Sequence, residues 1–159
     1  MATSYRAPTP WSPDRPETLV VCCSDGRWHG QVNEFVQAEV CQRADLYAVP
    51  GGPAVLDPWN SSFDEARVFE QSMRLFVEYH DLRHVWLIAH QGCAWYKLRH
   101  PHLEPAQLIA RQLSDLRRGR TLILERYPSY DVRLVIAELH GSGVVFRDCT
   151  HEPQEAPVR

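Results

Sequence analysis

The stretch LVVCCSDGRWHG, residues 19–30, places two cysteines, an aspartate and an arginine directly after a short run of apolar residues. A continuous apolar run of this length is typical of a parallel strand that is buried on both faces. The polar residues after it would lie at the carboxyl end of that strand, where open α/β sheets bind their ligands. The stretch therefore predicts an α/β fold with a site at the end of its first strand. It leaves open whether the cysteines form a disulfide, a redox thiol or a metal site.

Further along the chain, apolar runs typical of strands alternate with segments of helical periodicity. We expect strands at 45–49, 84–90, 132–139 and 144–148, and helices at 31–43, 61–82 and 105–126. This alternation favours right-handed βαβ units, and the GSG turn before the last strand favours a hairpin. The expected fold class is therefore α/β, with a mostly parallel four-stranded sheet flanked by helices and an added antiparallel C-terminal strand.

The length of 159 residues suits one domain with its own core. The proline-rich residues 1–16 have neither helical nor strand periodicity, and we expect them to form an extended N-terminal arm. We expect one folded domain to span residues 17–149. The polar residues 150–159 are expected to form a flexible tail, with Cys149 as an exposed thiol beside it.

The charge of the chain argues against a polyanionic partner. A net charge of -3 gives no basic surface for nucleic acid. The most basic cluster, residues 111–120, is interrupted by Asp115 and is interpreted as a solvated helix face. No apolar run approaches the ~20 residues of a membrane helix, and the N-terminus lacks the apolar core of a signal peptide. We therefore expect a cytoplasmic protein with no membrane partner.

Cysteine usage narrows the chemistry of the first stretch. Disulfides seldom persist in the cytosol, and five cysteines cannot all pair within one chain. A disulfide between the adjacent Cys22 and Cys23 would be strained, and the sequence contains no C-x-x-C motif, which disfavours a thiol redox protein. Metal chemistry is therefore the favoured interpretation.

A second motif, HQGC at residues 90–93, follows the third expected strand. Alone it is a weak signal, but it is expected at the same sheet edge as Cys23. Two thiolates and an imidazole form a Cys2His set, which is a known catalytic zinc arrangement with a fourth position open to water. Asp25 and Arg27 follow Cys23 closely, and a guanidinium beside the carboxylate would keep that carboxylate anionic. A surface ion pair is the alternative.

The motifs CSDGR, at residues 23–27, and HQGC resemble the C-x-D-x-R and H-x-x-C signatures of the β-class carbonic anhydrases. The resemblance implies one Zn²⁺ per chain held by Cys23, His90 and Cys93, with Asp25 and Arg27 as the catalytic pair. It implies that Cys22 is not a zinc ligand but packs in the core. It also implies reversible hydration of CO2 to bicarbonate by a zinc-bound hydroxide, in a homodimer or higher homo-oligomer.

The sequence departs from the family's pattern in three places. In the first motif, Gly26, with Trp28 and His29 after it, replaces a frequent serine. Residues 49–54, VPGGPA, lack an arginine and an asparagine that the family usually carries, and Ala94, followed by Trp95 and Tyr96, stands where glycine is usual. These departures leave two alternatives open: a hydrolase of carbonyl sulfide or carbon disulfide on the same scaffold, or a non-catalytic zinc-binding protein. It is also open whether Asp25 itself ligates zinc, and whether His29 shuttles protons or is simply exposed.

Overall fold

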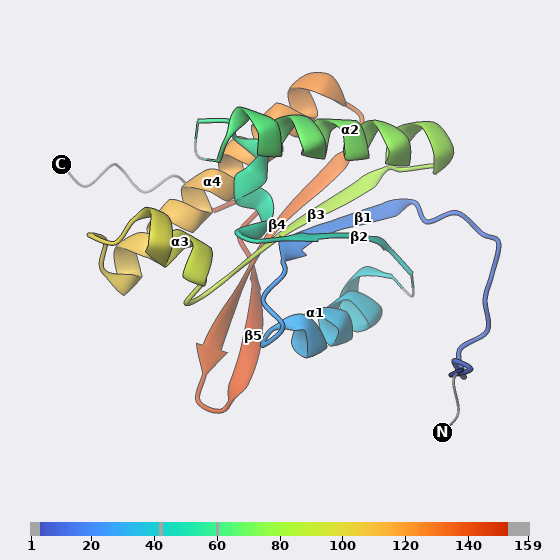
Figure 1. Cartoon of the computed structure of the whole chain (residues 1–159), viewed down its shortest axis with the longest axis horizontal. Helices are drawn as coiled ribbons and strands as arrows, with labels where there is room; N and C mark the ends of the chain where they lie inside the picture. Colours follow the sequence, from blue (N-terminus) through green and yellow to red (C-terminus); the bar gives the residue numbers. More distant parts are fainter. Residues whose placement is uncertain (1–3, 42, 60, 153–159) are drawn as a thin grey trace.

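A five-stranded sheet with strand order β2-β1-β3-β4-β5 forms the centre of the computed structural model, which describes residues 4–41, 43–59 and 61–152 (Figure 1). Its strands are β1 (Thr18–Cys23), β2 (Asp45–Val49), β3 (His84–His90), β4 (Asp131–His140) and β5 (Gly143–Asp148). The first four are parallel, and β5 pairs antiparallel with β4. The predicted α/β class, with its added antiparallel strand, is confirmed.

Helices cover both faces of this sheet (Figure 1). One face packs on α2 (Phe63–Tyr79) and α4 (Pro105–Arg126), and the other packs on α1 (His29–Phe35). Because side chains alternate along a strand, Leu19 and Val21 join the α2 and α4 side, whereas Val20 and Cys22 join the α1 side. Cys22 is therefore a core residue on the face away from the α2–α4 layer.

Local signals account for the starts of the two long helices, α2 and α4. Ser62 caps α2 by accepting a hydrogen bond from the Glu65 backbone N–H at 3.1 Å, and α4 begins with proline after Glu104, as the sequence predicts. The helix expected at 31–43 is different. It begins at His29 and continues after Phe35 as the π-helix η1 (Val36–Val40), which a 3.6-residue pattern does not reveal.

Two loops at the carboxyl edge of the sheet carry short helices. The loop after β2 turns through Gly51 into the buried 3₁₀-helix η2 (Gly52–Leu56). The loop after β3 leads into α3 (Ala94–Arg99), a six-residue helix that the sequence analysis did not predict. Both loops therefore lie beside the end of β1.

The chain ends bear on three expectations. Residues 4–16 contain neither helix nor strand, and the arm is held to the domain by an ion pair between Asp14 and Arg43 at 2.9 Å. The expectation of an exposed Cys149 was wrong, because Cys149 is 2% exposed and packs in the core cluster between the sheet, α2 and α4. Most of the expected flexible tail, residues 153–159, lies outside the described residues.

Within the described ranges, no helix is both long and apolar enough to cross a membrane.

Candidate metal centre

The ends of β1 and β3 bring Cys23, His90 and Cys93 together. Neighbouring parallel strands end at the same edge, so Cys23 and His90 meet, and the turn after β3 adds Cys93. The donor atoms of the three residues all lie within 4.8 Å of one another, and all three residues are buried. The two sulfurs are 3.8 Å apart. The structure thus gathers the three residues that the sequence analysis singled out.

His90 presents one ring nitrogen without a partner. Its Nδ1 lies 3.0 Å from the carbonyl oxygen of Gln91, and because that oxygen can only accept, Nδ1 carries the hydrogen. The Nε2 atom therefore keeps a lone pair, and it is buried with no hydrogen-bond partner among the described residues. The Trp28 ring packs on the imidazole with a centroid distance of 4.8 Å. A buried acceptor that is left unpaired is costly, and a bound metal ion would satisfy this one.

The two thiols share a proton. The pKa of Cys23 falls to about 4, chiefly because the Cys93 thiol donates a hydrogen bond to it, against the opposing effect of burial. The same hydrogen bond, together with burial, raises the pKa of Cys93. The backbone N–H groups of Asp25 and Gly51 also lower the pKa of Cys23. The pair therefore holds one negative charge in a buried place, where a cation is favoured.

These donors fit zinc. Soft thiolates with an imidazole select zinc over magnesium or calcium. Two sulfurs that each lie about 2.3 Å from one tetrahedral zinc are about 3.8 Å apart, which is the distance between Cys23 Sγ and Cys93 Sγ. The cluster could therefore hold the ion with little rearrangement of its sulfurs.

Asp25 and Arg27 form a pair beside this cluster. Arg27 donates to both carboxylate oxygens, from Nε to Oδ1 at 3.0 Å and from a terminal nitrogen to Oδ2 at 2.5 Å. The Arg27 side chain, and then its backbone N–H, lower the pKa of Asp25 to about 2 despite some desolvation. Asp25 is not a member of the three-residue cluster of potential ligands. Its carboxylate is available as an anionic hydrogen-bond acceptor.

Sequence reasoning missed a buried polar contact under the site. Asp115, interpreted as part of a solvated face, is 3% exposed and accepts a hydrogen bond from Tyr96 Oη at 2.8 Å. Arg111 pairs with the same carboxylate at 3.2 Å. The signal was present in the spacing, because Asp115 falls on the buried face of α4 that also carries Leu108 and Ile123. A buried aspartate on such a face needs a partner, and α3 provides it.

The remaining candidates are only partly accounted for. Cys22 is buried in the core, and desolvation raises its pKa to about 12. His29 has a buried Nε2 with no partner among the described residues, and its role as a proton shuttle stays a prediction. The ring of Trp95, whose position the sequence left open, lies against the loop after β2.

Known proteins resemble this chain in structure rather than in sequence. No family model and no curated protein matches this sequence. A tetrameric β-carbonic anhydrase from Sordaria macrospora is similar in structure, with a TM-score of 0.55 and 15% identity over 86% of this chain and 81% of that chain. The β-carbonic anhydrase CafA of Aspergillus fumigatus has a TM-score of 0.53 and 16% identity, covering 89% and 79%. Carbonic anhydrase from Streptococcus mutans has a TM-score of 0.55 and 13% identity, covering 88% and 86%.

This likeness defines the class of fold. The chain has the fold of the β-carbonic anhydrases, and at the end of its central strands it carries a Cys2His cluster that could bind a metal.

Proposed function

We propose that this protein is a zinc-dependent carbonate dehydratase that interconverts CO2 and bicarbonate. The observation that carries the proposal is the buried cluster of Cys23, His90 and Cys93, in which His90 Nε2 has a lone pair and no described partner. The β-carbonic anhydrase fold and the adjacent Asp25–Arg27 pair support it. One Zn²⁺ per chain is the proposed cofactor.

Each residue has a distinct role in this proposal. When bound, zinc would supply Lewis-acid chemistry that lowers the pKa of a water molecule to about 7. Cys23 and Cys93 would supply thiolate ligands, and the Gln91 carbonyl would orient the imidazole of His90 through Nδ1–H. Asp25 would accept a hydrogen bond from the reacting water, because Arg27 keeps its carboxylate anionic at neutral pH.

The test is stopped-flow CO2 hydration on protein whose zinc content is measured in parallel. We expect about one zinc per chain and fast hydration. Cys23→Ser should lose zinc and activity together, since a serine hydroxyl is a poor zinc ligand. Cys41→Ser is the matched control, because Cys41 is half-buried and its thiol donates to the Arg43 carbonyl oxygen at 2.9 Å, a bond that serine can also make.

The outcomes separate the alternatives. Stoichiometric zinc without CO2 hydration would reject carbonate dehydratase and turn the assay to carbonyl sulfide and carbon disulfide, or to a non-catalytic zinc protein. Stoichiometric zinc retained by Cys23→Ser would reject the ligand assignment.

A further inference from the structure

Trp95 lies against the backbone that approaches Cys23. A Cβ atom on Gly51 would be 2.6 Å from Trp95 Cδ2, so the indole is in direct contact with this glycine. Gly51 also has φ +80, a left-handed conformation that favours glycine. Two of the stretches in which the sequence departs from the carbonic anhydrase pattern, residues 49–54 and 94–96, are therefore in contact with each other.

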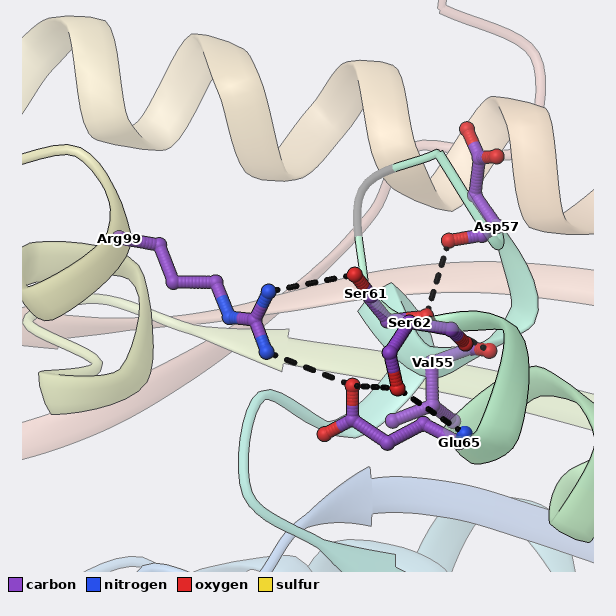
Figure 2. Close-up of polar contacts among 6 residues, drawn as sticks. All are labelled: Val55, Asp57, Ser61, Ser62, Glu65 and Arg99. Atoms are coloured by element: carbon purple, nitrogen blue, oxygen red, sulfur yellow. Dashed lines mark hydrogen bonds and ion pairs between the residues drawn. The ribbon is translucent and has the colours of Figure 1, made fainter.

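Arg99 holds this indole from the next turn of α3. Its guanidinium carbon lies 4.4 Å from the centroid of the Trp95 ring, a cation–π contact. The guanidinium is tied at the same time to the start of α2 (Figure 2), where it donates to the Ser61 carbonyl oxygen at 3.2 Å and to Glu65 Oε2 at 3.3 Å. Glu65 is in turn fixed by the hydroxyl of the cap residue Ser62 at 3.0 Å. Arg99 is thus attached to a rigid helix end.

The residues joined by this contact also border both thiols. Trp95 packs against the buried cluster that contains Cys23 and Cys93. Gly52, the neighbour of Gly51, packs on the backbone of β1, where a Cβ atom would lie 2.7 Å from Cys23 N. Groups packed around metal ligands orient those ligands and tune the metal. A shift of the indole would therefore move the backbone beside Cys23 and the helix start beside Cys93.

We propose that Trp95, held in place by Arg99, is a positioning residue that fixes Cys23 and Cys93 of the metal centre by packing the start of α3 against the loop after β2. The inference rests on the proposed metal site. Trp95 does not contact the substrate in this proposal. It would change the affinity of the site for its metal ion and the electronic character of the bound ion.

The experiment uses Co²⁺, which replaces zinc in thiolate sites and reports on them by its thiolate-to-cobalt absorption. Co²⁺ is titrated into the full chain and into four variants, and both the dissociation constant and the spectrum are recorded. Trp95→Ala removes the ring, Trp95→Phe keeps an aromatic ring against Gly51, and Arg99→Met keeps a long side chain without its charge. Arg126→Met is the control, because Arg126 also lies over an aromatic ring, Tyr127, and also pairs with a glutamate of α2, Glu70.

We expect Trp95→Ala to weaken Co²⁺ binding by about tenfold or more, as loss of supporting contacts around metal ligands typically does, and to shift the absorption. Arg99→Met should move both readouts in the same direction by less. Trp95→Phe and Arg126→Met should stay close to the unaltered protein. Merely lower stability would not produce this pattern of spectral shift and conservative rescue.

Two results would overturn the inference and are distinguishable. Unchanged affinity and spectrum in both Trp95→Ala and Arg99→Met would reject the positioning role while the metal site stands. Failure of the unaltered protein to bind Co²⁺ or Zn²⁺ would reject the metal site itself, and the inference with it. If Trp95→Ala does not fold, Arg99→Met decides, because the Arg99 side chain is 36% exposed.

Discussion

Gly52 is the residue that lets the loop after β2 approach the metal centre. It has φ +54, and a Cβ atom there would lie 2.7 Å from Cys23 N and 2.8 Å from Cys22 C. These neighbours are backbone atoms of the central strand, which cannot move aside as a flexible side chain could. The identity of the residue is therefore set by the backbone of β1.

Gly52→Ala should lower the free energy of unfolding by about 1–3 kcal/mol, because it adds both a steric clash and an unfavourable φ. Urea denaturation measures this change. Gly30→Ala is the matched control: nothing lies within 4 Å of a Cβ at Gly30, which sits in α1, so that variant should be neutral or slightly stabilised. Equal stabilities of the two variants would contradict the proposed close approach.

Asp25→Asn should retain zinc and lose activity by about 100-fold or more, because the amide cannot replace the anionic acceptor that Arg27 holds. The measurement is the rate of CO2 hydration at equal zinc content. Asp81→Asn, in the exposed loop between α2 and β3, is the control and should keep full activity. Full activity in Asp25→Asn would remove this carboxylate from the mechanism.

At the scale of the element, α3 shows what a short helix needs. It has six residues and no side chain that caps its start, so neither propensity nor periodicity reveals it in the sequence. Its stability comes from contacts with residues distant in the sequence, through Tyr96 to α4 and through Arg99 to α2. By contrast, α4 is long and strongly periodic, and the predicted range of 105–126 matches its bounds.

Tyr96→Phe should lower the free energy of unfolding by about 1–3 kcal/mol, because it removes a hydrogen bond to a buried carboxylate. It should also weaken zinc binding, since α3 follows Cys93 directly. Urea denaturation and a competition assay for zinc measure the two effects. Tyr79→Phe, on the exposed end of α2, should change stability by less than about 0.5 kcal/mol. A neutral Tyr96→Phe would show that the contact does not anchor α3.

At the scale of the whole molecule, the sequence was sufficient for topology because three buried strands and the short edge strand β2 appear as apolar runs that alternate with helices. The choice of Cys23 over Cys22 came from the resemblance to the C-x-D-x-R motif. Alternation along β1 sends the two side chains to opposite faces, which agrees with that choice but could not make it. It failed for Cys149 and Asp115, whose burial depends on residues far away in the chain. Local pattern predicts the period of an element, but not which neighbours cover it.

The outer surface argues for self-association. Leu46 on the edge strand β2 is 52% exposed, and Tyr5 and Trp11 of the arm are each 86% exposed. Such apolar groups on an edge strand and an extended arm are costly to leave in water. We expect light scattering with size-exclusion chromatography to give a dimer or larger at micromolar concentration. A stable monomer with full hydration activity would contradict this expectation.

The strand order has one more consequence, which concerns the cell's supply of zinc. The two candidate thiolates are 70 positions apart in the sequence and meet only when β1 and β3 are paired. An unfolded chain rarely presents all three ligands together, so the ion would bind the native state more tightly than the unfolded chain. At a free concentration of about 100 times its dissociation constant, zinc would then add up to about 2.7 kcal/mol to the free energy of unfolding. Zinc supply would therefore set the fraction of unfolded protein that proteases can attack, as well as the activity.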